Sequence, residues 1–125
     1  MNIFNNITRL RHTNAHGEIN FYKIEGGFVD MSEFTDFTDT NAAGDYIVGH
    51  SESGHHHLLG QHGVTVMERQ HKGMTVLHAI LENPTPLKQA ASSPHDAQIV
   101  EPGEYIIGAS LDYDPFTKQA RRVAD

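Results

Sequence analysis

The sequence predicts one all-β domain, a small barrel or sandwich built from about seven or more short antiparallel strands. Apolar residues recur with a period near two in short runs, which is the spacing of a half-buried strand. Gly, Pro, Asn and Asp interrupt these runs too often for long helices. The 125 residues, 38% of them hydrophobic, are enough for one core but hardly for two. We therefore treat residues 1–125 as a single domain.

The expected strands follow one another along most of the chain. They cover residues 19–24, 46–49, 55–59, 64–68, 74–81, 98–100 and 104–111. Turns are expected between them at 26–27, 41–44, 60–63, 83–84 and 102–103, where glycine permits positive φ or proline fixes φ.

Four segments depart from this alternation. Residues 31–40 fit a helical turn or a clasping loop, and Phe34 and Phe37 are expected to plug one end of the barrel as core residues. Residues 86–95 fit a mobile lid or a plain surface loop. Residues 1–18 form either an N-terminal arm or the first strand, and 112–125 form a C-terminal tail.

Composition narrows the function classes. The chain has no cysteine, which excludes disulfides, thiolate metal sites and cysteine nucleophiles. Its net charge of −7 argues against nucleic acid as a partner, because phosphate binding needs a positive face. The N-terminus does not resemble a signal peptide, and no apolar run approaches the ~20 residues of a membrane span. We expect no membrane partner and a cytoplasmic location.

The segment from Gly49 to His57 predicts a metal site, since it holds four imidazoles and one carboxylate. Neutral imidazole is the commonest ligand for first-row transition metals. On a strand His55 and His57 project to one side and His56 to the other. Glycines 49 and 54 allow a turn that brings His50 or Glu52 to the same ion.

More distant histidines complete the predicted site. His55 and His57 are the first ligands, and His50, His62 and His78 are alternatives for the remaining positions. His78 lies between apolar neighbours, where a buried core histidine and a ligand are equally good interpretations. With nitrogen and oxygen ligands alone, the cofactor would be divalent Fe, Mn, Ni, Co or Zn.

The other histidines carry less weight. His95 is either an exposed loop residue or a group that closes over the site. His71 is expected to face solvent, and His12 and His16 receive no role. If the site is catalytic, the ion acts as a Lewis acid, with Glu52, Tyr105 or His95 available for proton transfer. No catalytic residue is assigned, and whether the protein is an enzyme stays open.

Part of this pattern resembles the cupin superfamily. Gly49, five residues and then His55-x-His57 match the start of the first cupin motif, and Pro102-Gly103 resembles the turn of the second. Gln61 or His62 stands where the family has a glutamate. The resemblance implies a cupin-like barrel or jelly roll with a metal, and a small-molecule oxygenase, isomerase or lyase activity.

The chain also resembles small proteins encoded by phages and prophages. The shared segments are His50 to His57, Pro102 to Tyr105, the Asp112-Tyr113-Asp114-Pro115 run, and 121–125. This likeness implies a viral or mobile-element setting, with the protein in the cytoplasm of the host cell or in a virion, but no reaction. Three functions stay open: a metal-dependent protein acting on a small molecule, a β-rich virion structural protein that decorates a capsid or joins a tail, and a ligand-sensing module. A homo-oligomer, dimer or trimer, is expected, with a small-molecule ligand or other virion proteins as further partners.

Overall fold

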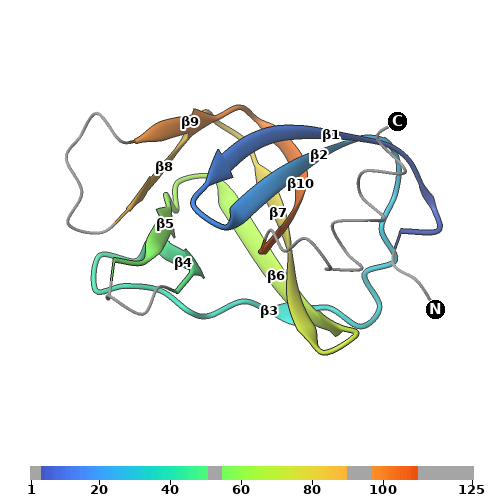
Figure 1. The fold of residues 1–125 in the computed structure, drawn as a ribbon, viewed down its shortest axis with the longest axis horizontal. Helices are drawn as coiled ribbons and strands as arrows, with labels where there is room; N and C mark the ends of the chain where they lie inside the picture. The colour runs from blue at the N-terminus through green and yellow to red at the C-terminus, as the bar shows by residue number, and fades with distance from the viewer. Residues whose placement is uncertain (1–3, 51–54, 90–96, 110–125) are drawn as a thin grey trace.

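The computed structural model describes residues 4–50, 55–89 and 97–109, and these form ten strands in two antiparallel sheets (Figure 1). The six-stranded sheet runs in the order β1 (Ile7–His16), β2 (Ile19–Gly27), β10 (Gly103–Ala109), β7 (Met74–Leu81), β6 (Val64–His71) and β3 (Thr35–Asp36). The four-stranded sheet runs β4 (Tyr46–Gly49), β5 (His57–Leu59), β8 (Thr85–Gln89) and β9 (Gln98–Val100). The predicted all-β class is confirmed, as an open sandwich and not a closed barrel.

No helix occurs in the described part of the chain, so it offers no apolar helix of membrane-spanning length.

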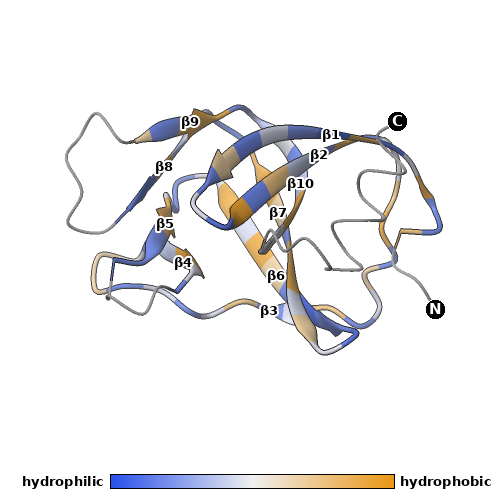
Figure 2. Ribbon diagram, in the orientation of Figure 1, coloured by the Kyte–Doolittle hydropathy of each residue, from blue (hydrophilic) through white to orange (hydrophobic). Residues whose placement is uncertain are grey.

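The main core lies where the two sheets face each other. On β7, Leu77, Ala79 and Leu81 point into this core, while Val76 and His78 point to the opposite face, as the two-residue period of a strand requires. Figure 2 shows the matching alternation of apolar and polar residues along β6. The main core contains Ile19, Phe21, Val48, Leu59, Val64, Val66, Leu77, Ala79, Leu81, Leu87, Val100, Tyr105 and Ile107.

A second core covers the other face of the six-stranded sheet. The segment before β1 and the segment between β2 and β3 fold over this face, and Phe4, Val29 and Phe34 are buried there. The remaining members are Ile7, Leu10, Tyr22, Ile24, Val76 and Ile106. The six-stranded sheet therefore separates two apolar cores, and residues on its two faces cannot share a site.

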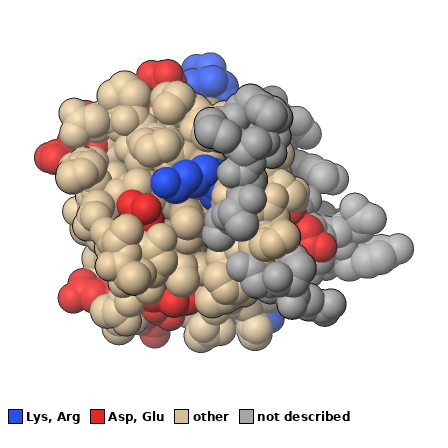
Figure 3. Space-filling model, turned by 90° about the vertical axis from the view of Figure 1, so that its left-hand side faces the viewer, with Lys and Arg blue, Asp and Glu red and all other residues tan. Residues whose placement is uncertain are grey.

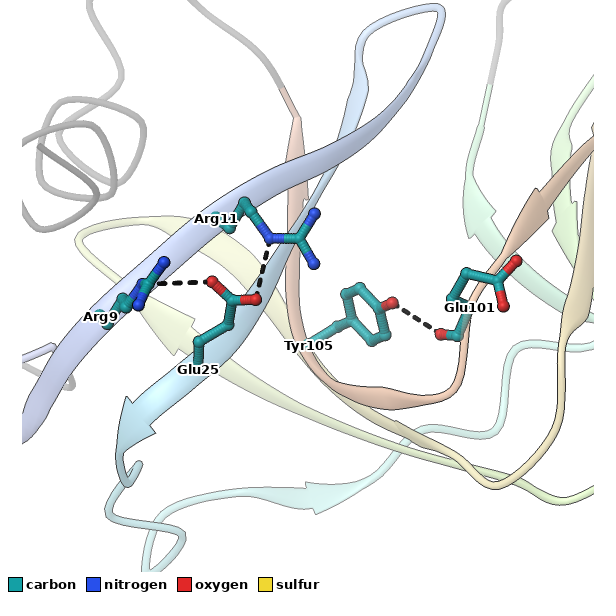
Figure 4. Close-up of polar contacts among 5 residues, drawn as sticks. All are labelled: Arg9, Arg11, Glu25, Glu101 and Tyr105. Atoms are coloured by element: carbon teal, nitrogen blue, oxygen red, sulfur yellow. Dashed lines mark hydrogen bonds and ion pairs between the residues drawn. The ribbon is translucent and has the colours of Figure 1, made fainter.

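Strand β1 settles the question of the N-terminal residues, because from Ile7 onward they form the first strand and not a free arm. It pairs with β2 through the turn at Gly17 and Glu18, where Gly17 has φ +62°. Glu25 on β2 accepts a hydrogen bond from Arg11 Nε at 2.9 Å and lies 3.4 Å from Arg9 Nε (Figure 4). The bond from Arg11 lowers the pKa of Glu25.

Residues 31–40 were expected to form a helical turn or a clasping loop. The Phe34 amide donates to the Met31 carbonyl at 3.1 Å across a turn, and only Thr35 and Asp36 form a strand, β3. Phe34 is buried in the second core, whereas Phe37 packs against the main core with its ring 6.2 Å from that of Tyr46. Both are core residues as predicted. The expectation that they plug one end together is wrong, because the sheet lies between the two cores.

The segment expected to be a loop from residue 86 begins with strand β8. Thr85 and Leu87 point inward with 2% and 0% exposure, while Pro86 and Lys88 are exposed. This alternation pairs β8 with both β5 and β9. The rest of the proposed lid, with His95, lies outside the described residues.

Candidate functional site

Two buried imidazoles meet where the β1–β2 turn approaches β5. His16 ends β1 and His57 begins β5, and their Nδ1 atoms lie 2.7 Å apart. The rings are edge to face, with centroids 4.8 Å apart, and the residues are 9% and 8% exposed. One Nδ1–H donates to the other Nδ1, because a neutral imidazole has one donor and one acceptor. We call these residues the inner pair.

Two glycines make room for the inner pair. A Cβ atom on Gly17 would lie 2.8 Å from His57 Cε1, and one on Gly49 would lie 3.1 Å from His57 Cδ2 and 2.6 Å from Ile19 Cδ1. Distances below 3.0 Å require a neighbour to move. The imidazole of His57 therefore packs against bare backbone on two sides.

A polar link between the sheets holds the β1–β2 turn in this position. Gln98 on β9 donates from Nε2 to the Ala15 carbonyl at 2.7 Å and accepts from Asn14 Nδ2 at 3.2 Å. These bonds join the end of β1 to the four-stranded sheet. His16 is thereby brought to His57, although 41 residues separate them.

The electrostatic environment keeps His57 neutral. Burial lowers the pKa of His57 below its ordinary 6.5, and the neighbouring imidazoles of His16 and His56 lower it further, while the charge of Glu18 opposes the shift. Neutral imidazole is the form that binds metals. His57 thus has the protonation state that the sequence analysis required of a ligand.

A second group of side chains, which we call the outer cluster, contains Asp39, His50 and His56. His50 Nε2–H donates to Asp39 Oδ2 at 2.6 Å, and the His50 and His56 rings lie edge to face with centroids 4.5 Å apart. The side chains of His50 and Asp39 are 60% and 43% exposed. His56 precedes His57 in the chain, and its ring contacts that of His50.

His78 lies on the other side of the six-stranded sheet. It is 3% exposed in the second core, donates from Nε2 to Glu104 Oε2 at 2.6 Å, and has the Phe34 ring 6.0 Å away. Its predicted burial is confirmed. Because the sheet separates it from His57, His78 cannot complete a site with that residue.

The other two predicted ligands are His55 and His62, and both lie at the surface. His55 is exposed, and its backbone carbonyl accepts from Gln89 Nε2 at 3.0 Å. His62 is exposed in the turn between β5 and β6. Across residues 4–50, 55–89 and 97–109, no three His, Asp or Glu side chains are placed to hold one metal ion. The described residues therefore do not fit a cupin-type set of three histidines and one glutamate.

Among the residues considered for proton transfer, Glu52 and His95 lie outside the described residues. Tyr105 is fully buried, and its hydroxyl donates to the Glu101 carbonyl at 2.6 Å (Figure 4). Burial raises the pKa of Tyr105. Its hydroxyl closes the turn before β10, which is a structural role.

Two histidines differ from expectation. His71 was expected to face solvent, but it is 5% exposed, with its ring edge to face with Phe4 at 5.8 Å. His16 was given no role, yet it is the partner of His57. The one local signal for His16 is the glycine that follows it, which starts a tight turn and makes His16 a strand end.

Figure 3 shows the end of the molecule that carries β4, β5, β8 and β9. Acidic side chains stand at several separate places on this face, with a few basic ones between them. No continuous basic area is seen there in the part of the chain that the structure describes.

No protein family, curated protein or solved structure matches the chain.

Proposed function

We propose that the protein binds one divalent transition-metal ion, with His16 and His57 as its protein nitrogen ligands. The observation that carries this proposal is the inner pair itself: two buried imidazoles whose Nδ1 atoms face each other at 2.7 Å. Of the ligands expected from the sequence only His57 stays in this set, and His16 takes the place of His55, His50, His62 and His78.

The geometry needs only a small adjustment to accept an ion. Two nitrogens at ~2.0–2.1 Å from a tetrahedral Zn²⁺ lie ~3.3 Å from each other. The Nδ1 atoms at 2.7 Å must therefore separate by roughly 0.6 Å, for which a slight rotation of the two rings would suffice. The ring that donates must also carry its proton on Nε2 instead, so that both Nδ1 lone pairs face the ion.

The third ligand in this proposal is Glu18, in the turn directly after His16. Its charge already acts on His57 and its side chain is exposed, although it must turn toward the pair before the three groups could hold one ion. Water would fill the remaining positions. Nitrogen and oxygen ligands of this kind suit Fe, Mn, Ni, Co or Zn and do not favour Mg²⁺ or Ca²⁺, which prefer oxygen alone.

The resemblance to phage and prophage proteins belongs to the same proposal. It gives the setting of a small metal-binding protein of a virus or mobile element, and no reaction is assigned. A β-rich structural role in a virion, without catalysis, is the alternative to which a negative metal test would lead.

The test is elemental analysis of untagged protein purified without added metal, and again after incubation with Zn²⁺ and dialysis. The wild-type protein should retain an ion that the His16→Ala, His57→Ala double variant loses. His62→Ala removes an exposed imidazole elsewhere and should change nothing. A variant with unchanged metal content, or a wild-type protein that retains no ion after incubation, would overturn the proposal.

A second readout avoids dependence on a variant that fails to fold. Co²⁺ added to wild-type protein should give visible d–d absorption bands of a low-coordinate nitrogen site, and Zn²⁺ should abolish them by displacement. The weak spectrum of hexa-aqua Co²⁺ throughout the titration would contradict the inner-pair site.

A further inference from the structure

We propose that the outer cluster is a second, solvent-facing cation site, in which His50 and His56 supply two imidazole nitrogens and Asp39 is a positioning residue. It would take exchangeable Ni²⁺, Cu²⁺ or Zn²⁺. This site is separate from the inner pair and does not depend on the function proposed above.

The backbone holds Asp39 beside the strand that leads to His50. The Ile47 amide donates to the Asp39 carbonyl at 2.8 Å, and Thr40 forms a β-bridge with Tyr46. Strand β4 ends at Gly49, so His50 is the next residue along this fixed stretch. The 2.6 Å contact between Asp39 Oδ2 and His50 Nε2 is thus built on two hydrogen-bonded segments and not on a chance meeting of surface side chains.

The carboxylate also decides which nitrogen of His50 can bind a metal. An ionised carboxylate only accepts hydrogen bonds, so Nε2 of His50 carries the hydrogen and donates it in the bond to Asp39. In the neutral ring the lone pair is then on Nδ1. Metal-binding histidines usually donate their other ring N–H to such a carboxylate, which fixes the tautomer and makes the ligand nitrogen more basic.

A second imidazole, that of His56, lies close enough to His50 to bind the same ion. The His56 ring centroid is 4.5 Å from that of His50, at an interplanar angle of 67°. Two ligand nitrogens on one ion lie ~3 Å apart, so two rings at this separation are close enough to share an ion.

The exposure of the cluster indicates what kind of binding to expect. With His50 60% and Asp39 43% exposed, water can complete the coordination, and an ion that exchanges some of its water ligands for imidazole can keep the others. Two imidazoles with water favour Cu²⁺, Ni²⁺ and Zn²⁺ over Mg²⁺ and Ca²⁺. The ion should exchange freely with solution, unlike one held by the buried inner pair.

The experiment is a calorimetric titration of the full chain with Ni²⁺. It compares the wild-type protein with the variants His50→Ala/His56→Ala, Asp39→Asn and His62→Ala. The outer double variant should lose one equivalent, and Asp39→Asn should keep the count with a Kd raised by about 10–100-fold. His62→Ala is the matched exposed control and should behave as wild type. All four substituted positions are outside the cores, and circular dichroism checks the fold.

The His16→Ala/His57→Ala variant separates this inference from the proposed function. If both sites exist, each double variant loses one equivalent. If the inner-pair proposal fails, the outer equivalent still disappears with His50 and His56. A Ni²⁺ count unchanged in His50→Ala/His56→Ala, or an unchanged Kd in Asp39→Asn, would overturn the outer site.

Discussion

His57 and His78 are both buried histidines on strands, but His57 is on β5 of the four-stranded sheet and His78 faces the second core from β7 of the six-stranded sheet. His57 meets another imidazole, whereas His78 meets the carboxylate of Glu104. His57 therefore lies beside a second possible nitrogen ligand, whereas His78 is hydrogen-bonded to a carboxylate and enclosed by the second core.

The two histidines also differ in what packs against their rings. His78 is surrounded by side chains of the second core, with Phe34 against its ring. His57 instead lies against Gly17 and Gly49, where a Cβ atom would crowd the ring. The position of His57 depends on side chains being absent, which is why the largest predicted effect comes from adding one.

Replacing Gly17 with valine should break the inner pair. Valine at φ +62° costs on the order of 1–3 kcal/mol in backbone strain, and displacing the His57 ring adds about 1–3 kcal/mol. Gly73→Val is the matched control, because Gly73 has φ +81° with nothing within 4 Å of its Cβ position. Urea unfolding should show a larger loss for Gly17→Val. Equal losses would mean that His57 does not pack on Gly17.

Removing the carboxylate partner tests the other buried histidine. Glu104→Ala should lower the free energy of unfolding by about 1–3 kcal/mol, because His78 Nε2–H then stays buried without its acceptor. Glu104→Gln keeps an acceptor oxygen and should lose less. Urea unfolding of the two variants measures this difference, and an alanine variant as stable as wild type would show that the contact contributes nothing.

The alternation of apolar residues was enough to predict β4, β7 and β9 with their observed bounds. It failed where the period of two is broken. Strand β1 has three register shifts against β2, so its apolar residues follow no simple alternation. In β8, Pro86 interrupts the sequence between the inward-pointing Thr85 and Leu87, and the segment therefore resembled a loop. Strand β3 has only two residues, too few to show any period.

Only the part of the candidate site that lies within one short segment of the sequence could be predicted. Glycine and histidine spacing around His57 identified that residue, and the same pattern drew attention to His50. The pairing of His57 with His16 depends on how two sheets pack, and no local pattern reports that. Asp39 was missed for the same reason, since its contact with His50 arises from the bridge between Thr40 and Tyr46.

The smallest predicted effect on stability comes from protonation of His57, because a change of pH leaves the packing intact. Its pKa is lowered below 6.5 in the folded protein, mainly by burial and then by His16. Between the folded-state pKa and 6.5 the unfolded chain binds more protons, so stability rises with pH through this window and levels off above it. Acidification should therefore destabilise the protein from about pH 6.5 downward.

His57→Gln should remove this part of the pH dependence when the free energy of unfolding is measured in urea between pH 5 and 8. Glu25 gives a matched reference, because its pKa is lowered from 4.5 by the bond from Arg11, and its contribution is lost only at more acidic pH. A wild-type profile that is flat around pH 6, or one unchanged by His57→Gln, would contradict the neutral state of His57. The neutral form is also what metal binding requires, so the same profile measured with saturating Zn²⁺ should steepen below pH 6.5, as protons displace the ion from the inner pair.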